Sequence, residues 1–175
     1  MKKFLPELVR SNGVLDLSSL KFGIPTKYVC ITGPDNCGKT NLCDGLAEYF
    51  SKNGKTVITA KASYDEQLLN YMSKLRGFCD FFICQGSTID QYVYEAERSV
   101  KEHSQKQNNQ QAKHLARFNM YIHLDCNIEN AKRLQRENKI LEDAYNVYFD
   151  TTKMSESDIL GKAVQAIYGY IKYLD

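Results

Sequence analysis

Gly33, Gly38, Lys39 and Thr40 stand at the spacing G-x-x-x-x-G-K-T, a pattern typical of loops that bind nucleoside phosphates. The glycines let the backbone wrap phosphates with its N–H groups, and a following helix adds partial positive charge at its N-terminus. Lys39 would contact the outer phosphates, and the Thr40 hydroxyl would ligate Mg²⁺. We therefore predict a site for ATP and Mg²⁺ formed by Gly33, Pro34, Asp35, Asn36, Cys37, Gly38, Lys39, Thr40 and Asn41.

Such a loop needs a strand before it and a helix after it, and the apolar pattern predicts both. Residues 26–32 form an apolar run typical of a buried strand. Residues 40–54 have helical spacing and end in a glycine that stops the helix. The side chains expected on its buried face are Leu42, Leu46, Tyr49 and Phe50.

Strands and helices alternate along the rest of the chain. Four more strands are predicted, at residues 56–62, 78–84, 119–125 and 146–152, and a closing helix at residues 155–174 is capped by Ser155. The alternation implies an α/β fold of three layers, with a five-stranded, mainly parallel sheet and helices on both faces. Ligands bind such sheets at the carboxyl ends of the strands.

Composition narrows the class of protein. The 175 residues are 43% hydrophobic and 25% charged, which is ordinary for one globular domain. A net charge of +2 does not indicate a strongly basic nucleic-acid binder. No run approaches the ~18 apolar residues of a membrane span, and the N-terminus does not resemble a signal peptide. The six cysteines form no C-x-x-C pair, so we interpret most of them as small buried hydrophobic residues in a reducing compartment.

Two motifs that are absent from the sequence exclude some classes of phosphate-loop protein. The chain has no N-K-x-D sequence, which argues against a GTPase, and no apolar strand ending in D-E or D-D, which argues against helicase-like and transporter ATPases.

Four stretches of the chain resemble a known family of kinases: GPDNCGKT, FFICQGSTIDQYVYEAER, MYIHLDCNIENAKRLQREN and AYNVYFDTTKMSESDILGKAVQAIYGYI. They resemble the thymidylate kinase and deoxynucleoside kinase branch of P-loop kinases, and more narrowly the deoxynucleoside monophosphate kinase-like proteins of bacteriophages.

The resemblance implies a domain organisation. It covers the chain from about Tyr28 to the end, so we expect a P-loop kinase domain over residues 26–175 with a lid around residues 127–143. Residues 1–25 have no counterpart and are expected to be an N-terminal extension packed on the core. The family also implies a homodimer and a cytoplasmic location, or the host cytoplasm if a phage encodes the chain.

The resemblance also implies catalytic residues. Asp35 falls where thymidylate kinases carry a loop carboxylate that contacts the sugar hydroxyl of the acceptor; its alternative role is to hold the loop turn by a hydrogen bond to the backbone. Arg133 and Arg136 lie about one turn apart on the lid-like helix. They either stabilise the transferring phosphoryl group or form a solvated face with Glu137. The catalytic prediction is Lys39, Asp35, Arg133 and Arg136.

The acceptor end departs from the family. The family's Asp-Arg pair after the third strand falls at Gln85-Gly86, so neither a base nor a bidentate cation stands there. Lys61 could supply the missing positive charge. Tyrosines on the helix after Gln85 either line the acceptor pocket or belong to the core, and Asp125 either reaches the site or caps the next helix. The predicted acceptor residues are Asp35, Lys61, Tyr64, Gln85, Asp90, Tyr94 and Arg98.

Three functional hypotheses follow. The first is an ATP- and Mg²⁺-dependent phosphotransferase whose acceptor is a deoxynucleoside monophosphate. The second is a phage-type kinase that phosphorylates a 5-hydroxymethyl-pyrimidine in DNA, with Lys101, Lys106 and Lys113 as contacts to the nucleic acid. The third is a module that binds ATP and transfers nothing. No membrane partner is expected.

Overall fold

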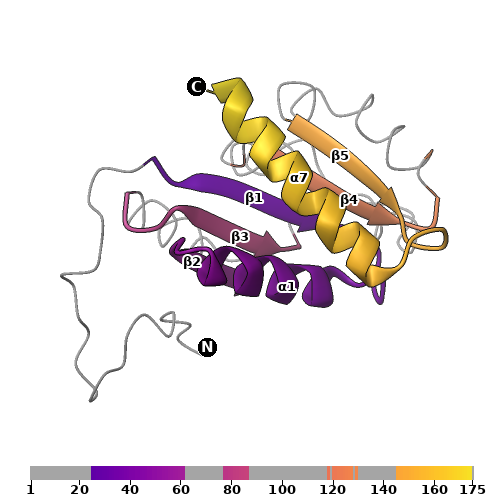
Figure 1. Ribbon diagram of the computed structural model, residues 1–175. Coiled ribbons are helices and arrows are strands. Elements are labelled where there is room, and N and C mark those ends of the chain that lie inside the picture. The colour runs from indigo at the N-terminus through magenta and orange to yellow at the C-terminus, as the bar shows by residue number, and fades with distance from the viewer. Residues whose placement is uncertain are drawn as a thin grey trace, which may run out of the picture.

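A computed structural model describes residues 25–61, 77–86, 118, 120–127, 129 and 145–174. Within these residues the elements follow one another as strand, helix, four strands and helix (Figure 1). Phe78 and Asp80 lie in the turn before the third strand rather than in it, and Thr151 and Thr152 lie in the turn after the fifth. Otherwise the predicted strands and the helices predicted at residues 40–54 and 155–174 are confirmed, as β1 (Lys27–Thr32), α1 (Lys39–Lys52), β2 (Val57–Lys61), β3 (Phe81–Gln85), β4 (Met120–Asp125), β5 (Tyr145–Asp150) and α7 (Glu156–Leu174).

The five strands form one parallel sheet in the order β2-β3-β1-β4-β5. Strand β1 is central, with Cys30 opposite Cys84 of β3 on one side and Tyr121 of β4 on the other. The chain fills the sheet on the β3 side of β1 first and then crosses to the β4 side. The reversal places a ligand crevice beyond the carboxyl end of β1, which is where the glycine-rich loop begins.

Helices α1 and α7 pack side by side on one face of the sheet (Figure 1). Alternate strand residues, among them Ile31, Ile83 and Ile122, point into the core with the apolar stripes of both helices. Leu42, Leu46 and Phe50 lie in this core as predicted, but Tyr49 is 37% exposed. It lies at the edge of the α1 stripe, where a hydroxyl can stay in water while the ring packs against Phe50.

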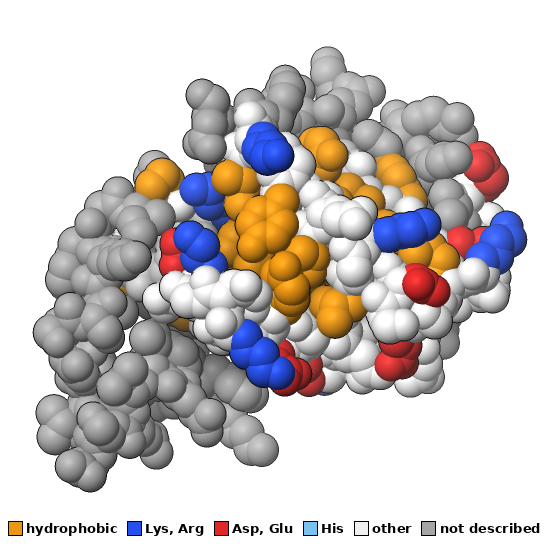
Figure 2. Space-filling view, viewed as in Figure 1, with side chains coloured by type: hydrophobic (Ala, Val, Ile, Leu, Met, Phe, Trp, Pro, Cys, Tyr) orange, Lys and Arg blue, Asp and Glu red, His pale blue; other side chains and the backbone are white. Residues whose placement is uncertain are grey.

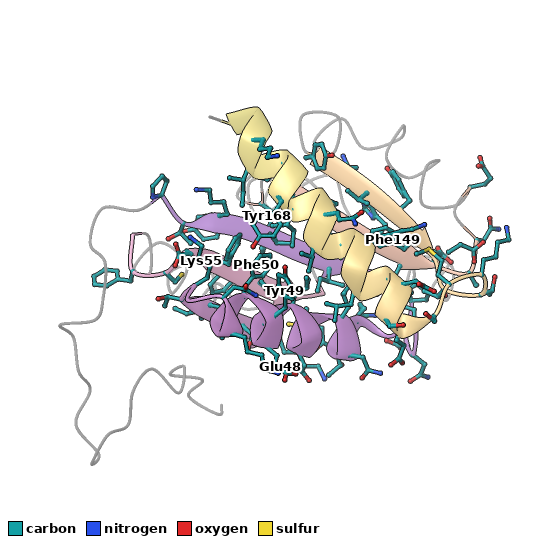
Figure 3. The ribbon with its side chains drawn as sticks, in the orientation of Figure 1. Glu48, Tyr49, Phe50, Lys55, Phe149 and Tyr168 are labelled. Carbon is teal, nitrogen blue, oxygen red and sulfur yellow. The ribbon has the colours of Figure 1, made fainter. Side chains whose placement is uncertain are left out.

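Helices α1 and α7 contact each other through aromatic rings and through a glycine that lets them pack closely. Phe50 stacks on Phe81 of β3 at 4.3 Å between centroids and meets Tyr168 of α7 edge-on at 5.7 Å. Figure 3 shows Phe50 and Tyr168 between the helices, and Figure 2 shows hydrophobic side chains gathered at the middle of this face. A Cβ added to Gly45 would lie 3.2 Å from Leu160, so this glycine lets the helices pack closely.

The opposite face of the sheet carries a buried polar group. His123 of β4 is 5% exposed, with Nδ1 2.8 Å from Thr32 Oγ1 and Nε2 2.9 Å from Asn146 Oδ1. Its ring stacks on Tyr148 at 4.8 Å between centroids. Because Thr32 immediately precedes Gly33, this pair of hydrogen bonds ties the end of β1 that enters the glycine-rich loop to β4 and β5.

The buried His123 predicts a specific dependence of stability on pH. Burial lowers the histidine pKa, against smaller opposing effects of the Asn146 hydrogen bond and the Asp125 charge. The unfolded chain, with a histidine pKa of about 6.5, therefore binds the proton more readily. The contribution of His123 to the free energy of unfolding is therefore fully present above about pH 6.5. It is lost as the pH falls below this value toward the lower pKa of the folded protein, by up to about 1.4 kcal/mol per pH unit.

The measurement is the urea midpoint of the wild type and of His123→Gln at about pH 7.5 and about pH 5.5. Glutamine keeps an amide for hydrogen bonds but cannot titrate. We expect the drop on acidification to be smaller in the variant. Equal drops in the two proteins would show that His123 does not cause the acid sensitivity.

Several expectations lie outside the described residues. These are the N-terminal extension apart from Pro25, the helices that should cover the second face of the sheet, and nearly all of the lid around residues 127–143.

Candidate nucleotide phosphate site

The loop from Gly33 to Gly38 joins β1 to α1 through backbone conformations that favour glycine. Gly33 has φ of +149° and Gly38 of +90°, and Asn36 adopts +61°, which asparagine tolerates better than most residues. A Cβ on Gly33 would lie 2.1 Å from the Leu124 carbonyl oxygen and 2.7 Å from Cys37 Sγ. Gly33 is therefore required both by its conformation and by the backbone of β4 beside it.

The two helices differ at their N-termini. Helix α7 is capped, since Ser155 Oγ accepts a hydrogen bond from the Asp158 N–H at 3.2 Å, which confirms the predicted cap. Its first turn also carries Glu156 and Asp158. Helix α1 has no side-chain cap at Gly38 and no acidic residue in its first turn. The first N–H groups and the positive end of the α1 dipole are therefore left to face an anion.

Lys39 lies across the loop. Its ammonium donates to the carbonyl oxygens of Gly33 and Pro34, each at 2.6 Å. These two carbonyls hold the cation at the mouth of the loop, next to the N-terminus of α1. Both positive features of the site, the ammonium and the helix end, thus belong to the same loop.

Thr40 and Gln85 meet at the carboxyl edge of the sheet. The Gln85 Nε2 amide donates to Thr40 Oγ1 at 2.7 Å. Lys61, the last residue of β2, stands opposite Gln85 in the strand register, and its side chain is exposed. The predicted residues of the donor site, which include Asp35, are therefore brought to one edge with Lys61 and Gln85 of the predicted acceptor site.

A cavity of about 520 Å³ adjoins the loop, between α1 and the β5–α7 turn. Asn36 and Asn41 line it from the loop side, and Thr151, Met154 and Ser157 line it from the turn. Asn41 Nδ2 donates to Glu156 Oε1 at 2.8 Å and so links the first turns of the two helices. The cavity gives the loop a neighbouring space with both polar and apolar walls.

The turn that borders this cavity is held by Asp150. The Thr152 hydroxyl donates to Asp150 Oδ1 at 2.6 Å, and the Thr152 N–H donates to the same oxygen at 3.0 Å. The Thr152 hydroxyl and then Lys153 lower the pKa of Asp150 to about 2, against some burial that raises it. The carboxylate therefore stays charged at neutral pH and fixes the turn.

The remaining predicted residues fall into three groups. Asp35 is exposed in the loop, and no hydrogen bond of its carboxylate occurs within the described part of the chain. The alternative that Asp35 holds the loop turn by a hydrogen bond to the backbone therefore gains no support. Asp125 is 4% exposed and accepts from the Asn127 N–H at 2.9 Å, as a residue that caps the following segment would. Outside the described residues lie Tyr64, Asp90, Tyr94, Arg98, Arg133 and Arg136.

The cysteines divide by position. Cys30, Cys43, Cys79 and Cys84 are buried, as predicted. Burial raises the pKa of Cys43 to about 12 and that of Cys79 to about 11, so these thiols stay protonated. Cys37 is half-buried in the loop, and Cys126 is exposed at the end of β4.

Inspection of the sequence missed several residues of this region. Thr151, Met154 and Ser157 belong to the cavity, and Glu156 bonds to Asn41. Their position just beyond the carboxyl end of the last strand was a usable signal, because ligands of parallel sheets gather at that edge.

None of the described helices is long and apolar enough to cross a membrane.

Comparison with known proteins gives fold but no sequence family. No family model and no curated protein sequence matches the chain. The YorR protein of Bacillus subtilis, solved in complex with phosphorylated GDP, aligns with 81% of this chain and 96% of its own at 15% identity and a TM-score of 0.48. Thymidylate kinase from Ehrlichia chaffeensis aligns with 82% of this chain and 99% of its own at 14% identity and a TM-score of 0.52. The latter similarity confirms the predicted resemblance at the level of structure: this chain has the P-loop kinase fold seen in thymidylate kinase.

Proposed function

We propose that this protein is an ATP- and Mg²⁺-dependent phosphotransferase that acts on a nucleotide, with a deoxynucleoside monophosphate as its acceptor. The observation that carries the proposal is the arrangement of the loop. The helix N-terminus at one end of the loop is uncapped, the Lys39 ammonium is bonded to the loop carbonyls, and the first glycine of the loop admits no side chain. Backbone N–H groups, a helix dipole and a lysine together form a site for phosphate.

The donor nucleotide fits the residues present. Lys39 would exchange the carbonyls of Gly33 and Pro34 for phosphate oxygens, which bind an ammonium more strongly because they are charged. The adjoining cavity lies where the sugar and base of a bound nucleotide would extend from the loop. Asn36, Asn41 and Thr151 offer hydrogen bonds there, and Met154 offers an apolar surface.

Magnesium fits the donor set as well. Thr40 presents an exposed hydroxyl oxygen in the first turn of α1, and hydroxyl and phosphate oxygens are the hard ligands that Mg²⁺ prefers. When bound, the cation would neutralise charge on the phosphates. The protein's own contribution is to hold the Thr40 hydroxyl through Gln85 and the Lys39 ammonium through the loop carbonyls.

The acceptor would lie along the edge formed by Asp35, Lys61 and Gln85. Asp35 has an exposed carboxylate able to orient a sugar hydroxyl, and Lys61 is a cation beside Gln85 that would attract a phosphate. We extend the acceptor site to Tyr64, Asp90, Tyr94 and Arg98, and assign Arg133 and Arg136 to the transferring phosphoryl group, on the strength of the family resemblance. The family's dimer and cytoplasmic location are proposed on the same basis.

One observation favours a second candidate, a kinase for a hydroxymethyl group on DNA. The position of the family's phosphate-gripping arginine is Gly86, and its backbone is fully engaged. The Gly86 N–H donates to the Ile31 carbonyl at 2.8 Å, and the Gly86 carbonyl accepts from the thiols of Cys30 and Cys84. An acceptor without a free phosphate would not need the missing arginine.

Incubation with ATP labelled on the γ-phosphate and Mg²⁺ tests the proposal. The acceptors are a panel of deoxynucleoside monophosphates, nucleosides and DNA containing hydroxymethyl-pyrimidine. We expect label on a monophosphate. Label on DNA alone would establish the second candidate instead, and saturable ATP binding without transfer to any acceptor would contradict both and leave a nucleotide-binding module.

A further inference from the structure

Gln85 contacts the residue that the proposed function assigns to the metal ion. Its amide Nε2 lies 2.7 Å from Thr40 Oγ1, across 45 residues of sequence. Within the described residues this amide is the side chain that hydrogen-bonds Thr40, and it brings no charge to the hydroxyl.

The backbone around Gln85 fixes the strand end that carries the amide. Gln85 pairs with Ile31 of β1 and with Lys61 of β2 in the sheet register. The next residue, Gly86, donates to the Ile31 carbonyl at 2.8 Å and accepts from the Cys30 and Cys84 thiols at 3.6 and 3.4 Å. Gln85 thus stands at a fixed strand end, and from there its side chain reaches Thr40.

The chemistry of the contact sets what it can do for a cation. A hydroxyl oxygen has two lone pairs, so an amide N–H that occupies one of them leaves the other for a metal ion. The amide therefore orients the hydroxyl. A carboxylate at the same place would add a negative charge near the phosphates, and that charge would repel a nucleotide until a cation neutralised it.

We propose that Gln85 is a positioning residue that orients the Thr40 hydroxyl toward a bound cation, and that it does so without the negative charge that a carboxylate would add beside the phosphates. The proposal rests on the proposed function, because it requires the loop to bind a nucleotide. It concerns the thermodynamic coupling between nucleotide and cation, which is the ratio of nucleotide dissociation constants without and with the cation.

Isothermal titration with ATP, in buffer containing Mg²⁺ and in buffer containing EDTA, measures that ratio. For Gln85→Glu we expect the ratio to rise about tenfold, mainly through weaker binding in EDTA, since the new charge lies close to the phosphates. For Gln85→Met, which fills similar space without a hydrogen bond, we expect weaker binding in Mg²⁺ with little change in EDTA, so that the ratio falls.

A matched control is Asn53→Asp at the other end of α1. It makes the same change from amide to carboxylate at an exposed position, about 20 Å away along a helix of 14 residues, which is well beyond the screening length at physiological salt. The ratio should stay at its wild-type value. A comparable rise in this control would overturn the proposal, because the effect would then reflect net charge alone.

The outcomes separate this inference from the proposed function. Wild-type binding of ATP with an unchanged ratio in both Gln85 variants overturns the inference and leaves the phosphate site intact. A purely structural role for Gln85 would weaken binding equally in the two buffers, which also overturns it. Absence of ATP binding by the wild type in either buffer overturns both. Thermal unfolding midpoints of the variants establish that each protein tested is folded.

Discussion

Gly33→Ala is expected to destabilise the protein by about 3 kcal/mol and to abolish nucleotide binding. The new Cβ would lie 2.1 Å from the backbone carbonyl oxygen of Leu124, which belongs to a central strand and cannot move aside as a flexible side chain can. The φ of +149° is itself a conformation that residues other than glycine avoid. The loop must shift to relieve both, and its N–H groups shift with it.

Urea denaturation and ATP titration measure the two effects. For a chain of this length, a loss of this size lowers the melting temperature by about 6–12 °C. Gly161→Ala is the control, since that helical glycine has open space around its Cβ position, and alanine there should stabilise by about 1 kcal/mol. If Gly33→Ala were as stable as the wild type, the close approach of loop and β4 described above would be wrong.

Lys39→Ala is expected to reduce phosphoryl transfer by about 100- to 1,000-fold with little loss of stability. The ammonium is the side-chain cation that the structure places at the mouth of the loop. With alanine in its place, no lysine stabilises the negative charge on the transferring phosphoryl group. Its two hydrogen bonds to Gly33 and Pro34 are partly exposed to water, so the folded state loses little.

Transfer rates with labelled ATP, combined with melting temperatures, separate these two effects. Lys52→Ala serves as the control because Lys52 forms an exposed ion pair with Glu48, which Figure 3 shows on the outer surface of α1, and such exposed pairs contribute little to stability. It should retain wild-type activity. Retention of full activity by Lys39→Ala would remove the lysine from the site we assign.

The sequence predicted the parts of this protein that depend on local patterns. The glycine-rich loop, the strand before it and the helix after it lie within a few residues of one another, and each has its own signature. Alternation of strands and helices then restricts the sheet to a few topologies, so the parallel sheet could be predicted as well. Ser155 was found because a cap and its helix are adjacent in sequence.

The contacts that complete the site could not be predicted in this way. Gln85 reaches Thr40 over 45 residues, His123 reaches Thr32 over 91, and Asn41 reaches Glu156 over 115. No local pattern reports such pairs, because they depend on which strand ends become neighbours. The sequence did show that Gln85 replaces a carboxylate of the family, and the structure adds that its partner is the Thr40 hydroxyl.

The central claim is that this loop binds a nucleoside triphosphate, and a titration of isotope-labelled protein with Mg²⁺–ATP, followed by backbone amide chemical shifts, tests it most directly. The predicted result is saturable shifts at Gly33, Gly38, Lys39 and Thr40, with further shifts at cavity residues such as Thr151 and Ser157, and their loss in Lys39→Ala. No saturable shift at the loop, or shifts confined to surfaces away from it, would contradict the account.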